Sequence, residues 1–132
     1  MKHSINLSFP GGKKVDVHLG EDFVVKTDQS KAHGGDASAP EPYSLFLSAY
    51  ASCAGIFALE FCKTRNLKVD ELKVEMVCDW NKEKHRYDSF EIVVTPPSDL
   101  PDKLRKALER SISLCSVKKT IVDPPEMKTT LL

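Results

Sequence analysis

The residues of this chain best suited to covalent chemistry are its four cysteines, Cys53, Cys62, Cys78 and Cys115. They lie far apart and form no Cys-x-x-Cys pair, which argues against a zinc site and against the disulfide framework of a small secreted domain. We therefore expect no metal and no cofactor, and thiols that are either buried and inert or redox-active. A thiol reacts as its thiolate, so a reactive cysteine needs a neighbouring group that lowers its pKa.

The settings of these cysteines differ, although spacing alone favours a structural role for each, because free cysteine usually behaves as a small buried hydrophobe. Cys53 lies about three turns into an apolar stretch, where a helix dipole has faded, so its activation would need a cation or a hydrogen-bond donor from another element. Cys115 is followed within four residues by two lysines, which is a more basic setting. Cys62 and Cys78 are expected to be structural.

The element that must position Cys53 is a stretch without charge, which runs from Pro42 to Leu59 in a chain that is 29% charged. Pro42 suits the first turn of a helix, and the polar residues 63–66 suit its end. At helical spacing, small and bulky residues fall on opposite faces. The small-residue face contains Ser44, Ser48, Ala51, Ser52, Gly55, Ala58 and Cys62, and the bulky face contains Phe46, Ala49, Tyr50, Cys53, Ile56 and Phe57.

A helix that is apolar all round is buried either in a protein core or in a membrane. The length is close to that of a membrane span, but the serines, Gly55 and Glu60 argue against one, so we expect a buried core helix. The sheet of a small domain can cover only one face of such a helix. The small-residue face is therefore expected to pack closely against another helix or a second subunit, and an intimate homodimer is favoured.

The rest of the chain consists of short strands and helices. We expect strands over residues 4–9, 15–19 and 23–26, a Gly/Ala/Ser loop over 31–40, the central helix, strands over 72–80 and 89–95, a helix over 100–114, a further helical piece from Cys115, and a closing edge strand over Glu126–Leu132. The order βββ-α-ββ-α-(α)-β predicts an α+β fold. The length of 132 residues predicts a single domain over residues 1–132.

Charge and the amino-terminal residues exclude several classes of function. The formal net charge is zero and the isoelectric point is about 6.9, so nothing indicates binding to nucleic acid or to an anionic membrane. Residues 1–20 hold no apolar run between a basic start and a small-residue cleavage site. No secretory signal is therefore visible, and a cytoplasmic protein is expected.

Two cysteine motifs resemble those of the OsmC/Ohr family. The segment 42–53, PYSLFLSAYASC, is similar to the central-helix motif of that family, which ends at its first cysteine. The segment 115–119, CSVKK, is similar to the second motif, Cys-Pro-Val-Ser-(Arg/Lys), and follows about sixty residues later. Each motif lies in its expected element, and the order of elements matches along essentially the whole chain. The chain is therefore identified as a member of this family.

The resemblance implies an intertwined homodimer in which sheets from both subunits enclose two central helices. It also implies a thiol peroxidase that reduces organic hydroperoxides in oxidative-stress defence, at a site on the dimer interface. Cys53 would attack the O–O bond, release an alcohol and become a sulfenic acid; Cys115 would then form a disulfide with it, and an external dithiol would restore both thiols. Phe46, Tyr50 and Phe57 would form an apolar pocket that suits a hydrophobic hydroperoxide.

The chain departs from the peroxidase subfamilies at two positions. Those subfamilies hold the thiolate with an N-terminal arginine and with a glutamate that precedes the first cysteine, whereas this chain has no arginine before Arg65. The residues that could take their place are Lys13, Glu41, Tyr43 and Glu60. Each also has an ordinary structural explanation, respectively a solvated turn, a helix start, packing and an exposed helix end.

Three hypotheses therefore remain open. The first is a thiol peroxidase in which Cys53 reacts and Cys115 resolves. The second is a non-catalytic dimer that binds a small hydrophobic ligand at the interface, which the missing arginine and glutamate favour. The third is a purely structural dimer with inert cysteines. The pKa of Cys53 would separate the first two, since a value near the usual ~8.5 favours binding and a value well below ~7 favours catalysis.

Overall fold

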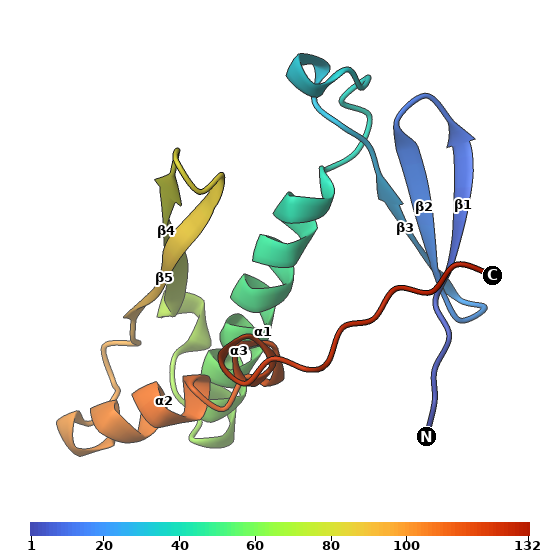
Figure 1. Ribbon diagram of the computed structural model, residues 1–132. Helices are drawn as coiled ribbons and strands as arrows, with labels where there is room; N and C mark the ends of the chain where they lie inside the picture. Colours follow the sequence, from blue (N-terminus) through green and yellow to red (C-terminus); the bar gives the residue numbers. More distant parts are fainter. The chain divides into compact units, whose positions relative to one another are not determined.

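The computed structural model describes all 132 residues, which fall into two compact units, residues 1–48 and 49–132. The order of elements is that of an α+β protein, as the sequence predicts (Figure 1). In chain order they are β1 (Asn6–Gly11), β2 (Lys14–Leu19), β3 (Phe23–Thr27), α1 (Pro42–Thr64), β4 (Lys73–Asn81), β5 (Arg86–Thr95), α2 (Arg105–Ile112) and α3 (Ser116–Val122), with short 3-10 helices at Lys31–His33, Val69–Glu71 and Asp102–Leu104. Every predicted helix and every predicted strand except the last is present.

The first unit contains an antiparallel sheet in the order β1-β2-β3. Its register places Leu7 opposite Val17 and Val17 opposite Val25, so these apolar side chains share one face of the sheet. Leu7 and Phe23 are nevertheless 54% and 68% exposed. The apolar face of this sheet is therefore incompletely covered within a single chain.

The loop between β3 and α1 is held by a buried carboxylate. Asp28 accepts hydrogen bonds from the hydroxyl (2.6 Å) and N–H (3.0 Å) of Ser38 and from the N–H of Gln29 (2.7 Å). The Ser38 hydroxyl first, and then these N–H groups, lower the pKa of Asp28 to about 2. Gly35 packs against the same turn, because a Cβ there would lie 2.6 Å from the carbonyl carbon of Gln29. The loop therefore requires glycine at this position.

Helix α1 begins and ends where the sequence predicts. Pro42 is its first residue, and the chain leaves it at Asn66, which adopts a left-handed conformation (φ 55°). The N–H of Leu67 donates to the carbonyl of Cys62 (3.0 Å) and the N–H of Asn66 to that of Lys63 (3.1 Å), which is the pairing of a Schellman motif. Leu67 then packs against the apolar core, so the end of α1 is tied to the segment that follows.

Burial along α1 differs from the predicted pair of faces. The buried residues form one stripe, which consists of Tyr50, Ala54, Ala58, Phe61 and Cys62. This stripe includes residues from both predicted faces. One hairpin and two short helices can cover only part of the circumference of α1. Phe46 and Ile56 stay 41% and 48% exposed. Within the single chain α1 is therefore buried along one stripe, and the cover of its other face by a second subunit stays a prediction.

Helix α1 also has the length and the mean hydropathy (1.6) of a membrane-crossing helix. This similarity rests on length and composition only, and the core helix of a globular protein passes the same test. In this chain the buried residues Ala58, Phe61 and Cys62 pack in one cluster with Leu100 and Leu108. The carboxyl-terminal half of α1 therefore acts as a core helix of the second unit.

Strands β4 and β5 form one antiparallel hairpin in the second unit (Figure 1). The predicted alternation is confirmed, since Val74, Met76 and Cys78 are half-buried and the residues between them are exposed. Val74 lies opposite Val94, and Cys78 lies opposite Phe90. The hairpin therefore directs one apolar side toward the core, where Val74 and Val94 pack against the buried cluster.

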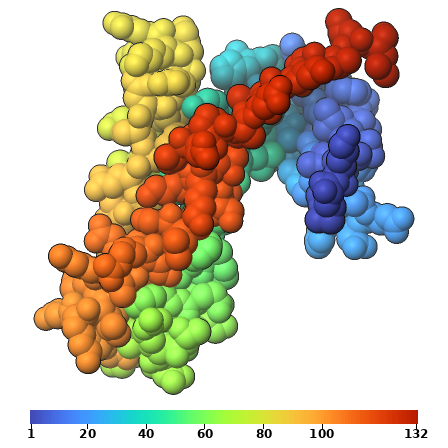
Figure 2. Space-filling model, turned by 60° about the horizontal axis from the view of Figure 1, so that its bottom comes forward, coloured from blue at the N-terminus to red at the C-terminus, as the bar shows by residue number.

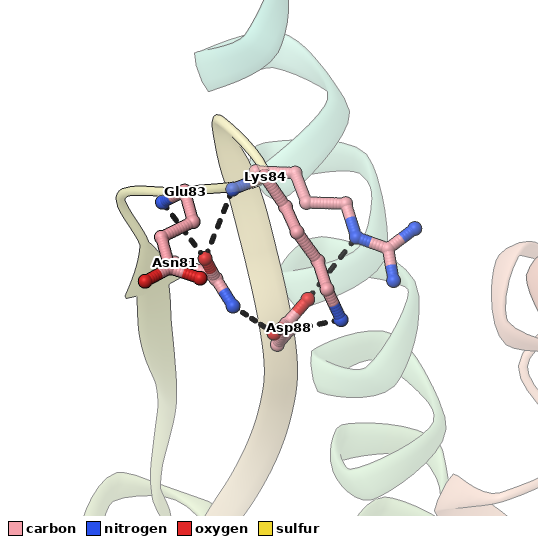
Figure 3. Close-up of polar contacts among 5 residues, drawn as sticks. Asn81, Glu83, Lys84 and Asp88 are labelled. Carbon is pink, nitrogen blue, oxygen red and sulfur yellow. Dashed lines mark hydrogen bonds and ion pairs between the residues drawn. The ribbon is translucent and has the colours of Figure 1, made fainter.

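The tip of this hairpin is an ordered polar turn (Figure 3). The Asn81 side chain accepts hydrogen bonds from the N–H groups of Glu83 and Lys84 (3.0 Å each) and donates to Asp88 (2.6 Å). Lys84 and Arg86 form ion pairs with Asp88 at 3.6 Å and 3.1 Å. All of these partners belong to the hairpin, so the turn is fixed locally.

Helix α2 begins later than predicted, because Asp102–Leu104 forms a 3-10 helix ahead of it. Leu108 is its buried residue, at 3% exposure, and Leu104 and Ile112 lie four residues to either side and pack against the same core. This i, i+4 spacing places all three on one side of α2. The predicted apolar face of this helix is confirmed.

The predicted closing strand is absent. Residues 124–132 form neither strand nor helix and leave α3 as an extended, exposed segment (Figure 1, Figure 2). Pro124 and Pro125 lack N–H groups, and a strand forms only where the edge of another strand is available for pairing. The prediction of a strand over Glu126–Leu132 is therefore wrong for the single chain.

Candidate functional site

Cys53 and Cys115 meet within the second unit, although about sixty residues separate them in the sequence. Cys53 is half-buried in α1, and Cys115 is fully buried at the residue before α3. Cys115 lies close enough to Cys53 for its thiol to lower the pKa of Cys53 as a donor. Both are free thiols, as are Cys62 and Cys78. The arrangement lets each of the two thiols affect the pKa of the other.

The turn between α2 and α3 sets the position of Cys115. Its N–H donates to the carbonyl of Ile112 (3.3 Å), and its own carbonyl accepts an N–H of α3 (3.0 Å). Cys115 itself is not helical (φ −48°, ψ 124°), so the chain changes direction there and α3 begins at the next residue. The first N–H groups of a helix have no partner within it. Here the N–H groups of Ser116 and Val117 lower the pKa of the Cys53 thiol.

The two thiols have pKa values that are shifted in opposite directions. The pKa of Cys53 is lowered mainly by the Cys115 thiol and, to a smaller extent, by the N–H groups of Val117 and Ser116. Burial offsets part of this effect. The pKa of Cys115 is raised mainly by burial and, to a smaller extent, by the neighbouring Cys53. The N–H groups of Lys118 and Val117 offset part of this rise. Donors stabilise a thiolate and burial destabilises it. Of the two thiols, Cys53 is therefore the one that loses its proton at the lower pH.

Tyr50 lies one helical turn before Cys53 in α1. It is 8% exposed, and its ring meets that of Phe90 edge-on, with 6.0 Å between the centroids. Burial first and the neighbouring Cys115 second raise the pKa of Tyr50, which keeps its phenol protonated. The structure thus places this aromatic residue beside the two thiols.

A half-open cavity of about 460 Å³ adjoins Tyr50. Its walls come from Tyr50 of α1, residues 90–96 of β5 and the segment after it, Leu108 and Ile112 of α2, and Lys118 of α3. Two acidic and two basic side chains add balanced charge to a largely aliphatic and aromatic lining. The volume suits a small organic molecule.

The other two aromatic residues predicted for a pocket lie elsewhere. Phe57 is half-buried and lines a shallower groove together with Phe61 and Leu114. Phe46 belongs to the first unit, where it meets Tyr43 edge-on at 5.7 Å between ring centroids. Of the three, Tyr50 is the one that lines the cavity described above.

Of the remaining candidate residues, Glu41 anchors a loop, and Lys13 and Glu60 are exposed. Glu41 accepts a hydrogen bond from the N–H of Ser30 (2.8 Å) and lies 2.8 Å from Nδ1 of His33. Ser30 first and His33 after it lower the pKa of Glu41 to about 2, so this carboxylate anchors the loop ahead of α1. Lys13 is exposed in the turn between β1 and β2, and Glu60 is exposed near the end of α1.

The sequence did not predict that the N–H groups of Ser116 and Val117 lower the pKa of Cys53. A signal was present, because the predicted helical piece after Cys115 must begin with N–H groups that lack partners within the helix. The sequence does not show that these groups face Cys53, since that contact joins α3 to the distant helix α1. Backbone donors therefore supply part of what was expected from side chains alone.

A family model and several solved structures both match this chain. The family model described as OsmC-like protein matches residues 34–130. The OsmC-like protein from Mycoplasma pneumoniae is similar in structure, with a TM-score of 0.69 at 12% identity over 94% of this chain and 89% of that chain. An OsmC-like hydroperoxide resistance protein from Jannaschia sp. CCS1 gives 0.56 at 26% identity (97% and 90%), and the organic hydroperoxide resistance protein OhrB of Bacillus subtilis gives 0.52 at 18% identity (89% and 90%). A comparison with curated proteins finds no match.

Proposed function

Because the chain belongs to the family of OsmC-like proteins, whose model matches residues 34–130, we propose that it is a thiol peroxidase that reduces organic hydroperoxides through Cys53 and Cys115. The observation that carries the proposal is that the two thiols affect one another, which shifts their pKa values in opposite directions. Two proteins of similar fold are named for hydroperoxide resistance, which supports a role in defence against peroxides.

In the first step the Cys53 thiolate attacks the terminal oxygen of the hydroperoxide. The O–O bond breaks, Cys53 retains that oxygen as a sulfenic acid, and the alkoxide leaves and is protonated to an alcohol. Cys53 suits this role because it is only half-buried and because donors lower its pKa. The Cys115 thiol and the N–H groups of Ser116 and Val117 take the place of the arginine and glutamate that hold the thiolate in the peroxidase subfamilies.

In the second step the Cys115 sulfur attacks the sulfur of the sulfenic acid. An S–S bond forms and the S–O bond breaks, and the Cys115 hydrogen leaves with the hydroxyl group as water. Cys115 suits this role because it is the thiol whose proximity lowers the pKa of Cys53. An external dithiol then reduces the Cys53–Cys115 disulfide and restores both thiols.

A homodimer is part of this proposal. Leu7 and Phe23 of the first unit and Ile56 of α1 are exposed apolar side chains, and a second copy of the chain would remove such surface from water. Closure of the dimer over the thiols would also favour a hydrophobic hydroperoxide over hydrogen peroxide. Sedimentation equilibrium should give twice the chain mass of 14.7 kDa. A monomer at every protein concentration would argue against the dimer.

Mass spectrometry after one equivalent of cumene hydroperoxide tests the mechanism. The parent protein should lose two hydrogen atoms in mass, and peptide mapping should find Cys53 joined to Cys115. Cys53→Ser should consume no hydroperoxide. Cys115→Ser should keep the first step and accumulate a sulfenic acid at Cys53, which dimedone traps.

Cys78→Ser is the matched control, because Cys78 is a half-buried thiol in β4 with no part in the proposed mechanism. It should form the disulfide at the parental rate. If Cys53→Ser consumed cumene hydroperoxide as fast as the parent, the mechanism would be wrong. A parent protein that bound the hydroperoxide without consuming it would instead be a binding protein.

A further inference from the structure

The half-open cavity of about 460 Å³ is a feature of the second unit that the mechanism above leaves unused. Neither Cys53 nor Cys115 lines it, so a molecule bound there is not held for reaction with a thiol. Its wall is mostly apolar, and the apolar side chains from α1, β5 and α2 are Tyr50, Phe90, Ile92, Val94, Leu108 and Ile112. All six are buried or half-buried. A space of this size with such a wall suits the apolar part of a small molecule.

One lysine of the wall differs from the other charged residues there. Lys118 of α3 is half-buried, whereas Glu91, Arg105 and Glu109 are exposed. The Lys118 ammonium donates a hydrogen bond to the hydroxyl of Ser113, which also lines the cavity, at 3.4 Å. This is the one hydrogen bond of the Lys118 side chain, which forms no ion pair. An ammonium has three hydrogens to donate, so two remain for a ligand.

A half-buried ammonium without a carboxylate partner favours an anion in the cavity. Water and salt screen the exposed charges of Glu91, Arg105 and Glu109, whereas a partly buried charge is screened less. A carboxylate beside Lys118 would accept charge-assisted hydrogen bonds, which are about twice as strong as neutral ones. The Ser113 hydroxyl accepts from Lys118 and keeps its own hydrogen, so it can donate to the same carboxylate. The polar and apolar parts of the wall together suit a ligand with a carboxylate and an apolar chain.

We propose that this cavity is a binding site for a small amphipathic carboxylate. The carboxylate binds Lys118 and Ser113, and the alkyl chain lies against the apolar wall. The site is separate from the two thiols and does not depend on the peroxidase function proposed above. Because its wall combines α1, β5, α2 and α3, a bound ligand should stabilise the folded second unit and raise the midpoint of thermal unfolding.

Isothermal titration calorimetry with octanoate tests the class of ligand. Octanoate should bind more tightly than hexanoate, by up to about fourfold for each additional buried methylene group. 1-Octanol and octylamine present a similar alkyl chain without a negative charge, and each should bind at least about tenfold more weakly than octanoate. If 1-octanol bound as tightly, the ammonium would contribute nothing, and if octylamine bound more tightly, the acidic residues would dominate. Either result overturns the proposal.

Lys118→Met tests the residue that is proposed to hold the carboxylate. Methionine keeps an unbranched apolar side chain and removes the charge. We expect the affinity for octanoate to fall about tenfold and the affinity for 1-octanol to stay unchanged, which also shows that the variant keeps its cavity. Lys119→Met is the matched control, because Lys119 is the next residue of α3, is exposed and does not line the cavity. Equal weakening of octanoate binding in both variants overturns the proposal.

The position of bound octanoate is measured by nuclear Overhauser effects. Contacts between its alkyl chain and the methyl groups of Ile92, Leu108 and Ile112 are expected. Contacts only to Leu114, in the groove that Phe57 also lines, would place the ligand elsewhere and overturn the proposal. The same holds if millimolar octanoate does not bind, as when a second copy of the chain covers the cavity. No hydroperoxide enters these measurements, so their failure leaves the peroxidase function untouched.

Discussion

Replacement of Gly35 by alanine adds one methyl group at the most crowded glycine of the chain. The new Cβ would lie 2.6 Å from the carbonyl carbon of Gln29 and 2.8 Å from Oδ1 of Asp28, whereas ordinary contacts begin at 3.4 Å. The neighbour is backbone, which cannot rotate away as a flexible side chain can. The carbonyl oxygen of Gln29 would lie nearer still, so the loop must open by more than about 0.8 Å. The hydrogen bonds of 2.6–3.0 Å that hold Asp28 must lengthen with it.

The free energy of unfolding should fall by about 2 kcal/mol. An overlap of this size lies near the upper end of the cost of an added methyl group in packed structure, about 3 kcal/mol. Alanine also restricts the unfolded chain, which offsets about 0.7 kcal/mol. For a chain of this length, a net loss of about 2 kcal/mol lowers the midpoint of thermal unfolding by about 8 °C.

Thermal unfolding followed by circular dichroism measures this change. Lys31→Ala is the matched control, because Lys31 is exposed in the same loop, and its midpoint should stay within about 1 °C of the parent. A midpoint for Gly35→Ala that is equally close to the parent would refute the view that Gly35 closes the loop around Asp28.

Three further changes test other contacts. Cys115→Ala removes the first donor to Cys53, so the pKa of Cys53 should rise and its alkylation by iodoacetamide at mildly acidic pH should slow, whereas Cys62→Ser should leave that rate unchanged. Asp28 contributes stability that is complete above its ordinary pKa of 3.8 and is lost as the pH falls through about 2, so Asp28→Asn should be less stable at neutral pH and should flatten the acid limb of the unfolding midpoint. Leu108→Ala, at a position that is 3% exposed, should lower the free energy of unfolding by about 2–5 kcal/mol in urea titrations. Unchanged alkylation, an unchanged acid limb or a loss below about 1 kcal/mol would each contradict the contact concerned.

The sequence predicted those features that depend on neighbouring residues. Pro42 and the polar residues 63–66 mark the two ends of α1, because proline suits a first turn and the end needs a residue that tolerates a left-handed conformation. The alternation over residues 72–80 marks β4 in the same way. The two cysteine motifs identified the family, and with it the fold class, because each motif sits in its own element.

The sequence could not predict features that depend on contacts between distant segments. Both faces of α1 are apolar, so periodicity does not show which stripe the rest of the chain covers. The effect of the Ser116 and Val117 N–H groups on the pKa of Cys53 joins α3 to α1, and no local pattern encodes it. The strand expected over residues 126–132 has the right composition, but a strand also needs an edge to pair with.

Because Cys115 is completely buried, the two sulfurs of the proposed disulfide differ in their access to solvent. A reducing thiol from solution can approach the sulfur of Cys53, which is half-buried, but not that of Cys115. The mixed disulfide therefore forms at Cys53, and Cys115 is the leaving group. Because burial raises the pKa of Cys115, it leaves slowly. If the proposed cycle operates, we therefore expect reduction of the disulfide to be slower than peroxide cleavage and the oxidised protein to accumulate while hydroperoxide is present.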